Sequence, residues 1–399
     1  MTQPKSYYIH TFGCQSNKSD SERVAGDYEA RGYVLADDWR NCDELIVNTC
    51  AIRQRAEHRA RGFLNNVKVY FEELELTKPS QLLSATVPRK RPKIILTGCM
   101  THHGHAKLLE MLPIVDEILP INEVGFNQAA IRRDKVHAWL PISTGCNSFC
   151  TFCIVPYSRG REQSRSFESI LEEVTRLVLE GYTELTLLGM NVNSWGLEKV
   201  GIGFRKLMME RKDFGREELP SNQSQYLTPT DTPPFVKLLQ ALSGFKQITK
   251  IRFMTSNPWD FHDELIAEIA TNKKIDRFVH LPVQSGSNAV LYRMNRGYTR
   301  ETYLELARKL RAADPDIVLG TDIIVGFPGE TEAEFQDTVS LAEEIGWKVG
   351  FVAMYSPRPG TASWRIYEDD VPHPVKKERW EILDKIINKN TMADRPYIV

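Results

Sequence analysis

The sequence has no long apolar run and few cysteines. No stretch approaches the roughly 18 consecutive apolar residues of a membrane-spanning helix, and the opening MTQPKSYYIHTFGC does not resemble a secretory signal. These absences favour a cytoplasmic protein with no membrane segment. Seven cysteines in 399 residues are too few for a disulfide framework. In a reducing compartment, metal binding or catalysis is the better interpretation of them.

The chain also lacks an excess of charge of either sign. Lys and Arg number 51 and Asp and Glu number 52, which gives a net charge of −1. No global basic field therefore points to a nucleic-acid partner, although local basic patches remain compatible with one. The apolar share of 42% and the charged share of 26% are ordinary for a globular protein, and the length allows two or three domains.

The first third of the chain alternates apolar runs with helical patterns. Three runs, SYYIHTFGC, DELIVNTC and PKIILTGC, end at Cys14, Cys50 and Cys99, and helical patterns over 19–33 and 53–75 follow the first two. This alternation predicts a parallel α/β sheet, in which ligands gather at the carboxyl ends of the strands. Each cysteine alone is typical of a buried core thiol. Their shared position at three strand ends predicts a common metal site.

A second series of apolar runs predicts a different kind of sheet. Six runs, most of them separated by helical patterns, begin at positions 137, 184, 250, 277, 317 and 349. We therefore expect an α/β protein with a flavodoxin-like parallel domain over 1–135 and a partial (β/α)6 barrel over 136–395. Polar and glycine-rich residues follow each run, where barrel active sites are built.

Three further segments have less specific interpretations. The polar insertion 196–232 is typical of a surface loop, with a lid or an RNA-contacting element as the alternative. The basic TVPRKRPK at 86–93 is interpreted as a solvated loop, again with RNA contact as the alternative. VKKERWEILDKIINKNTMADR near the end predicts an amphipathic helix.

The stretch TGCNSFCTFC places Cys146, Cys150 and Cys153 within eight positions. Three thiolates this close can hold three irons of a cubane cluster and leave the fourth iron open to an exchangeable ligand. Structural zinc normally takes four ligands, and no fourth cysteine or histidine lies near in the sequence. An iron–sulfur cluster is therefore favoured.

This spacing, with Phe152 before the last cysteine, resembles the signature of the radical S-adenosylmethionine (radical SAM) superfamily. The resemblance implies that the methionine moiety of SAM chelates the open iron. It also implies that an electron from the reduced cluster cleaves SAM to a 5′-deoxyadenosyl radical, which abstracts a hydrogen atom. The superfamily uses a six-unit β/α barrel, in agreement with the strand pattern.

More motifs narrow the resemblance to the methylthiotransferases. They are TFGCQSNKSDSERVAG, IVNTCAIRQRAE, LTGC, GCNSFCTFCIVPYSRGREQSR, HLPVQSGS and DIIVGFPGET. By this resemblance, Cys14, Cys50 and Cys99 hold a second, auxiliary [4Fe–4S] cluster that carries or supplies sulfur. One SAM would donate a methyl group and another would generate the radical.

Within the family, GCQSN, HLPVQSGS and VPYSRG look most like the branch that modifies isopentenyl-adenosine of tRNA beside the anticodon. Alternatives are the branch acting on threonylcarbamoyl-adenosine, the branch acting on a ribosomal protein, and a non-catalytic iron–sulfur redox sensor. The implied partners are tRNA, an electron donor such as flavodoxin or ferredoxin, and a sulfur source. We expect a monomer.

Candidate SAM contacts lie at barrel strand ends. They are Phe152, Gly189, Asn191, Gln284, Ser285, Asp322 and Gly326; a turn role is the alternative for the glycines. Three arginines are candidates for the SAM carboxylate or RNA phosphate, with surface charge as the alternative: Arg159, Arg161 and Arg165. Glu330 precedes a helical pattern, which predicts a capping role.

Other residues have simpler interpretations or depart from the family pattern. Cys42 is expected to be a buried structural thiol, and His102, His103 and His105 a solvated helix start. Asn257 stands where the family often has histidine, which puts a substrate-side contact in doubt. The resemblance also implies a C-terminal RNA-binding barrel domain, which we expect to be missing here, either because the sequence is a fragment or because the enzyme acts without that domain.

Overall fold

The computed structural model describes residues 4–52, 54–76, 90–124, 129–197 and 232–388. The chain divides into two compact units. Unit 1 comprises residues 1–134 and 157–160, and unit 2 comprises residues 135–156 and 161–399. Almost all of the insertion 196–232, half of the basic segment 86–93 and the end of the C-terminal helical pattern lie outside the described residues. In the described part of the chain, no helix is long and apolar enough to cross a membrane.

Unit 1 is built on a five-stranded parallel sheet in the order β2-β1-β3-β4-β5. Its strands are β1 (Ser6–Thr11), β2 (Val34–Leu35), β3 (Glu44–Thr49), β4 (Lys93–Gly98) and β5 (Glu117–Ile118). Every residue of β3 is buried, as expected for a strand covered on both faces. The strand order is that of flavodoxin, so the prediction of a flavodoxin-like parallel domain is confirmed.

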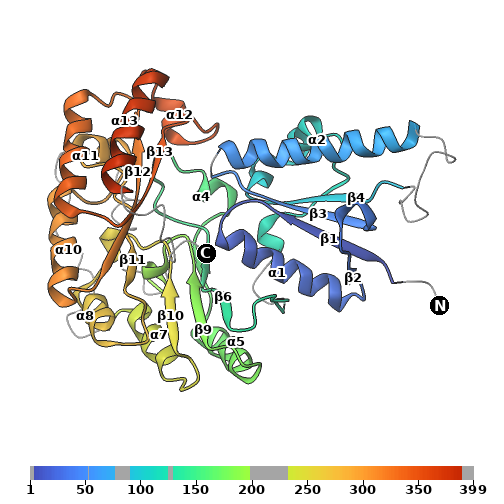
Figure 1. Ribbon diagram of the computed structural model, residues 1–399, viewed down its shortest axis with the longest axis horizontal. Helices are drawn as coiled ribbons and strands as arrows, with labels where there is room; N and C mark the ends of the chain where they lie inside the picture. Colours follow the sequence, from blue (N-terminus) through green and yellow to red (C-terminus); the bar gives the residue numbers. More distant parts are fainter. Residues whose placement is uncertain (1–3, 53, 77–89, 125–128, 198–231, 389–399) are drawn as a thin grey trace. The chain divides into compact units, whose positions relative to one another are not determined.

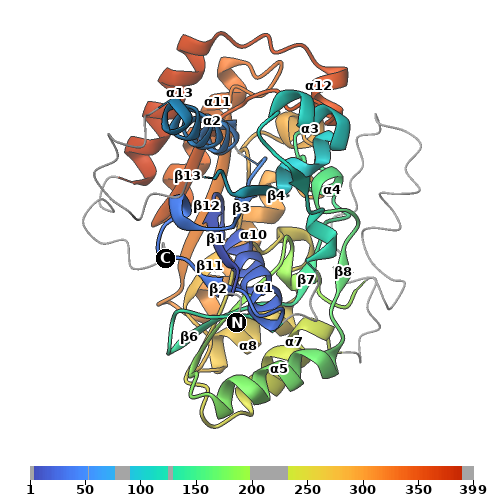
Figure 2. The ribbon, with the colours of Figure 1, turned by 90° about the vertical axis from the view of Figure 1, so that its right-hand side faces the viewer.

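Two long helices cover this sheet from opposite faces (Figures 1 and 2). Helix α1 (Gln15–Ala30) packs Val24 and Tyr28 against Tyr7 and Ile46 of the sheet. Helix α2 (Gln54–Leu76) buries residues three or four positions apart, which is the spacing of one helix face: Ala60, Leu64, Val67 and Phe71. After β4 the chain forms a short 3-10 helix, Cys99–His103, and then α3 (His105–Met111).

Unit 2 contains six parallel strands arranged as two three-stranded sheets. The first sheet has the order β10-β9-β6 and consists of β6 (His137–Pro141), β9 (Glu184–Leu188) and β10 (Lys250–Phe253). The second has the order β11-β12-β13 and consists of β11 (Phe278–His280), β12 (Val318–Val325) and β13 (Val349–Met354). The prediction of a partial (β/α)6 barrel is confirmed in its six parallel strands separated by helices.

Helices separate successive strands of unit 2. They are α5 (Phe167–Leu179), α7 (Pro234–Ser243), α8 (Asp263–Thr271), α9 (Asn288–Arg293), α10 (Arg300–Ala313) and α11 (Glu332–Ile345), and α12 (Ala362–Ile366) and α13 (His373–Ile387) follow the last strand. Figure 2 shows α5 and α7 side by side. Several begin at a side-chain cap: Ser166 Oγ accepts the Ser169 N–H at 3.1 Å, and Thr299 Oγ1 accepts the Thr302 N–H at 3.3 Å.

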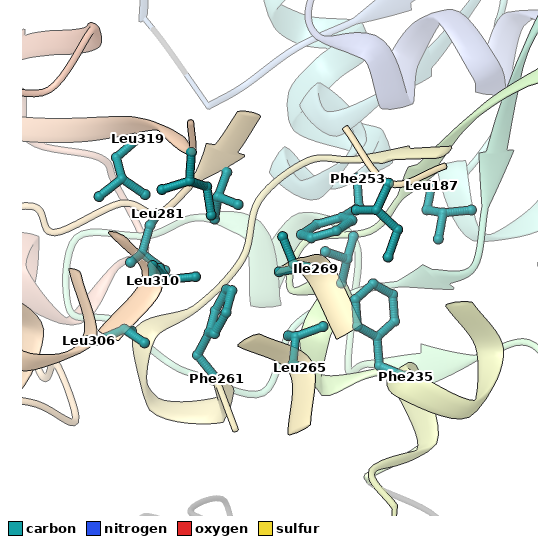
Figure 3. Packing of buried hydrophobic residues seen from close by; sticks show 14 of the residues in the cluster. Leu187, Phe235, Phe253, Phe261, Leu265, Ile269, Leu281, Leu306, Leu310 and Leu319 are labelled. Atoms are coloured by element: carbon teal, nitrogen blue, oxygen red, sulfur yellow. The ribbon is translucent and has the colours of Figure 1, made fainter. Parts of the chain in front are cut away.

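The core of unit 2 joins these helices to the strands (Figure 3). Phe253 of β10 lies among side chains of α7 and α8, and Leu319 of β12 lies near Leu310 of α10. These side chains are at most 3% exposed. Burying one such side chain contributes about 1.5–3 kcal/mol. The packed core therefore fixes the strand ends, from which the candidate site is built.

Candidate functional site

The three cysteines of unit 1 lie at one edge of its sheet. Cys14, Cys50 and Cys99 directly follow β1, β3 and β4, which are neighbours in the sheet. A Cβ atom added to Gly13 would lie 2.9 Å from the Cβ of Cys50, so the loops after β1 and β3 are in contact. Cys99 is fully buried, Cys50 is 4% exposed and Cys14 is half-buried. The structure therefore places the three residues at one sheet edge, as the strand pattern predicts, and a shared metal site stays a prediction.

Glycine precedes two of these cysteines because other residues would not fit. Gly98 has φ of +91°, and a Cβ there would lie 2.2 Å from the carbonyl oxygen of Thr49. Gly13 has φ of +123°. Both backbones occupy the region that side-chain-bearing residues avoid. Close approach of the loops and left-handed backbone together orient Cys14 and Cys99.

Arg159 belongs to unit 1 and contacts the same cysteine group. Its Nε–H donates to the Sγ of Cys99 at 3.3 Å, and its Nη2 donates to Oδ2 of Asp20 at 2.7 Å. The side chain is buried. A contact between Arg159 and SAM or RNA, as the sequence suggests, stays a prediction.

The second cysteine group forms a loop in unit 2, between β7 (Ser143–Thr144) and α4 (Val155–Ser158). The Ser148 N–H donates to Cys146 Sγ at 3.4 Å, and the Cys153 N–H donates to the Cys150 carbonyl oxygen at 3.0 Å. Burial raises the pKa of the Cys146 thiol to about 11, and burial together with the charges of Cys150 and Cys146 raises the pKa of Cys153. The three thiols are thus close enough to influence one another.

Both cysteine groups have the donor set of an iron–sulfur cluster. Thiolates are the usual ligands of such clusters, and ligand thiols must lose their protons to bind. Among the described residues, no three His, Cys, Asp or Glu side chains converge as the ligands of a single ion would. A cubane does not need that convergence, because each thiolate binds a different iron. The residues present therefore fit a cluster in each unit.

Buried polar atoms without partners gather at the ends of the first sheet of unit 2. The Oγ of Ser143, the Oδ1 of Asn191 and the Oγ of Ser256 are buried and have no hydrogen-bond partner among the described residues. They follow β6, β9 and β10. Asn191 Nδ2 contacts Ser194, and a Cβ at Gly189 would lie 2.5 Å from Ser143 Oγ. Because buried polar groups are normally paired, these atoms fit a polar ligand such as SAM.

The predicted residues of the second sheet divide into two kinds. Gln284 has φ of +74°, its N–H donates to the Asp322 carbonyl oxygen at 2.8 Å, and Asp322 Oδ2 lies 3.2 Å from His280 Nε2. Left-handed backbone at a residue other than glycine is costly and is concentrated at functional sites. Ser285, in contrast, is fully buried and interacts through its Oγ with Thr338.

The remaining predicted cofactor residues lie in the same unit. Gly326 donates its N–H to Oε2 of Glu330 at 2.6 Å, and Phe152 packs half-buried against the core. For all seven predicted SAM contacts the cofactor role stays a prediction, and Gln284, Asp322 and Asn191 are the positions whose geometry favours it.

Comparison with known proteins agrees with this geometry. Residues 140–342 match the radical SAM superfamily, and residues 6–120 match the uncharacterized protein family UPF0004. A tRNA-2-methylthio-N(6)-dimethylallyladenosine synthase of Thermotoga petrophila is 38% identical over 391 residues, covering 94% of this chain and 80% of the relative. The enzyme of that name from Clostridium botulinum is 37% identical over 401 residues, covering 96% and 81%. This chain belongs to the radical SAM methylthiotransferase family.

Solved structures support the fold of this methylthiotransferase. The radical SAM methyltransferase TsrM from Kitasatospora setae, with cobalamin and a [4Fe–4S] cluster bound, aligns with a TM-score of 0.57 at 14% identity, covering 91% of this chain and 77% of that one. The cobalamin-dependent radical enzyme OxsB aligns with a TM-score of 0.52 at 11% identity, covering 97% and 56%. At such identities the likeness concerns the fold alone.

One expectation for the methylthiotransferase is wrong. Glu330 does not cap the helix that follows; Thr331 does, because its Oγ1 accepts the Glu334 N–H at 3.3 Å. The Glu330 carboxylate instead accepts hydrogen bonds from Gly326 and from Nη1 of Arg379 at 2.9 Å. Because the Glu330 carboxylate is buried and bonded to Gly326 and to Arg379 of α13, it does not accept from the free N–H groups at the start of α11.

Two other arginines differ in their surroundings. Arg165 is 5% exposed, and its Nη1 donates to Oε2 of Glu173 at 2.7 Å and to the Pro141 carbonyl oxygen at 3.0 Å. This arrangement explains the residue as part of the fold of unit 2. Arg161 is exposed. Substrate contact stays a prediction for both, and exposure favours Arg161.

Three minor expectations can also be compared. Cys42 is 5% exposed, its thiol donates to the Trp39 carbonyl oxygen at 3.1 Å, and burial raises its pKa to about 12, so it is a buried thiol as expected. His102 and His103 are half-buried rather than solvated, and only His105 is exposed. The backbone of Asn257 is paired with the side chain of Asn193.

Arg296 contacts a predicted cluster ligand although no sequence pattern points to it. This residue is 5% exposed, and its Nη1 donates to the Sγ of Cys150 at 3.1 Å. The two residues are 146 positions apart, and Arg296 lies in the loop between α9 and α10, outside every motif that carries the family resemblance. Local pattern therefore gave no indication of it.

Proposed function

We propose that this protein adds a methylthio group at C2 of isopentenyl-adenosine beside the anticodon of tRNA, with one SAM as radical source and another as methyl donor. The proposal is supported by the combination of two cysteine groups with close similarity to known enzymes. The chain has two groups of three cysteines, one in each unit, and it is 37–38% identical over nearly its whole length to relatives named for this modification. A radical SAM protein needs one such group, and the second suits a sulfur-inserting member.

The two groups would hold two [4Fe–4S] clusters. Cys146, Cys150 and Cys153 would bind the radical SAM cluster, and Cys14, Cys50 and Cys99 the auxiliary one. When bound, the first cluster supplies the electron that cleaves SAM, and the auxiliary cluster supplies sulfur.

The chain's own residues would bind and shield the reactants. Ser143, Asn191 and Ser256 each offer a buried unpaired oxygen to polar groups of SAM. Gly189 allows close backbone approach at the end of β9. Asp322 is a carboxylate suited to accept hydrogen bonds from hydroxyl or ammonium groups. The buried core beneath these strand ends excludes water from the floor of the site.

Contacts outside the site are also part of the proposal. Arg161, exposed directly after the unit 1 segment 157–160, would pair with RNA phosphate. The chemistry requires a one-electron donor such as flavodoxin or ferredoxin and a source of sulfur. We further propose a monomeric protein in the cytoplasm, with domains at 1–135 and 136–395.

Mass spectrometry of nucleosides tests the substrate. Anaerobically reconstituted protein would be incubated with SAM, a reductant and tRNA that carries either isopentenyl-adenosine or threonylcarbamoyl-adenosine. A methylthio mass gain on the first nucleoside alone is expected. A gain only on the second would assign the protein to the other tRNA branch, and no gain on either would refute tRNA methylthiolation.

Matched cysteine variants test the separate roles proposed for the two cysteine groups. Wild-type protein should bind about eight irons per chain, and a variant that lacks one cysteine of either group should bind about four. Cys150→Ala should abolish SAM cleavage, whereas Cys50→Ala should retain cleavage and lose methylthiolation. Methylthiolation that persists in Cys50→Ala would contradict the auxiliary site, and one zinc in place of iron would contradict both clusters.

A further inference from the structure

Arg296 is held rigidly beside one predicted cluster ligand. Besides donating from Nη1 to Cys150 Sγ at 3.1 Å, it donates from Nη2 to the Pro282 carbonyl oxygen at 3.0 Å and from Nε to the Tyr298 hydroxyl at 2.9 Å. The guanidinium lies 4.8 Å from the centre of the Trp259 ring. Three acceptors and the rings of Trp259 and Tyr298 thus fix its orientation.

The neighbours of Arg296 leave its charge unbalanced. A buried cation is costly unless an anion accompanies it. Other buried arginines of unit 2 have a carboxylate, as Arg165 has Glu173 and Arg379 has Glu332 in addition to Glu330. In the described part of the chain, no carboxylate oxygen lies within 4 Å of an Arg296 nitrogen, and its acceptors are a sulfur, a hydroxyl and a carbonyl. The group in contact that can carry negative charge is the Cys150 sulfur, once it is a metal-bound thiolate.

The contact of Arg159 with Cys99 in unit 1 differs in this respect. Arg159 also donates to a cysteine sulfur, but Asp20 at 2.7 Å already balances its charge. Arg159 therefore gives Cys99 a hydrogen bond but no net positive charge, whereas Arg296 gives Cys150 both a hydrogen bond and a positive charge.

We propose that Arg296 is a positioning residue that supplies the counter-charge of the Cys150 thiolate and raises the reduction potential of the cluster held by Cys146, Cys150 and Cys153. The inference rests on the proposed function. Hydrogen bonds to the sulfurs and net charge are two of the factors that set the potential of an iron–sulfur cluster. A nearby cation stabilises the reduced state, which has one more negative charge, and so eases the entry of the electron.

Other bonds hold the cysteine loop in place independently of Arg296. Thr151 donates its N–H to the Met294 carbonyl oxygen at 3.0 Å and its hydroxyl to the Arg293 carbonyl oxygen at 2.9 Å. Asn295 Nδ2 donates to the Phe149 carbonyl oxygen at 3.1 Å. These contacts do not touch sulfur. A change at Arg296 can therefore alter the cluster without undocking its loop.

The test is an EPR-monitored redox titration of the full chain in a Cys50→Ala background, so that one cluster is observed. Arg296→Gln should shift the midpoint potential to a more negative value and speed iron loss to a chelator roughly 10- to 100-fold. Arg296→Lys retains the charge without the three contacts and should give an intermediate potential. Asn295→Gly is the matched control: it removes a docking bond, suits a backbone with φ of +56°, and should leave the potential unchanged.

Three outcomes would contradict either the proposed role of Arg296 or the proposed cluster site. Arg296→Gln with the potential and iron retention of Asn295→Gly would overturn the proposal. Should Arg296→Gln not fold, Arg296→Met, which also removes the charge but keeps an apolar stem beside Trp259, takes its place, and a potential equal to that of Asn295→Gly would overturn the proposal equally. Absence of iron from the Cys50→Ala parent would instead refute the proposed cluster site, which separates that failure from a failure at Arg296.

Discussion

Asn17 and Asn48 exchange hydrogen bonds beneath the cysteine edge of unit 1. Asn17 Nδ2 donates to Asn48 Oδ1 at 3.0 Å, and Asn48 Nδ2 donates to the Asn17 carbonyl oxygen at 2.8 Å. Both side chains are fully buried. The pair joins the start of α1, three residues after Cys14, to the end of β3, two residues before Cys50. It therefore fixes the spacing of two predicted ligands.

Asn48→Ala should destabilise unit 1 and loosen its cysteine group. Loss of the Asn48 amide leaves the buried Asn17 amide without one acceptor, which costs about 1–3 kcal/mol. We expect a lower urea midpoint and an iron content that falls from about eight toward about four per chain. Unchanged stability and iron content would show that the pair does not support the site.

Gly98→Ala should be more harmful than Gly32→Ala. Both glycines have positive φ, +91° and +83°, so both substitutions incur a backbone cost of about 1–3 kcal/mol. A Cβ at Gly32 meets nothing within 4 Å, whereas at Gly98 it meets the Thr49 backbone. Thermal unfolding should show Gly98→Ala to be roughly 1–3 kcal/mol worse than its control. Equal losses would mean that the loops yield without strain.

Arg165→Gln and Arg161→Gln should separate folding from RNA binding. Arg165 and Glu173 form a buried pair at 2.7 Å, with side chains 3% and 6% exposed, so removal of the cation should cost about 3–5 kcal/mol of stability. Arg161→Gln should leave stability unchanged and reduce the salt slope of tRNA binding by about 1. Denaturation and binding across a salt series measure the two effects. A salt slope unaffected by Arg161→Gln would refute its phosphate contact.

Glu330 should make stability depend on pH. Burial, which outweighs the hydrogen bonds from Gly326 and Arg379, raises its pKa from 4.5 to about 7. The folded protein then keeps a proton that the unfolded chain releases above pH 4.5. The protonated Glu330 therefore contributes fully to the free energy of unfolding below pH 4.5. This contribution is lost as the pH rises through 7, which lowers the free energy of unfolding by roughly 3 kcal/mol.

Glu330→Gln should remove this dependence. Urea midpoints of the variant would decline less between pH 5 and pH 7.5 than those of the wild type. Parallel declines in the two proteins would place the titrating group elsewhere.

Much of the molecule could be predicted because the relevant patterns are local. Strand and helix periodicity identified the parallel α/β architecture of both units, and the cysteine positions at the ends of β1, β3 and β4 followed from chain order alone. The spacing of Cys146, Cys150 and Cys153 within one loop carried the cofactor class. The assignment of Glu330 as a cap was wrong for two reasons. Thr331, one residue later, is the better cap chemically, and the Glu330 carboxylate is bonded to the buried Arg379 of α13.

The sequence by itself determined the fold class, the two cysteine groups and the family, because each can be recognised from short segments: a strand followed by a cysteine, the three-cysteine loop and the family motifs. Only the tertiary structure decided which side chains serve those cysteines. Arg296 meets Cys150 across 146 positions, Arg159 meets Cys99 across 60, and Asn17 meets Asn48 across 31. Such contacts leave no periodic trace, since they depend on how the strands pair and how the loops pack. They determine how much charge and how much rigidity the protein provides around each predicted cluster.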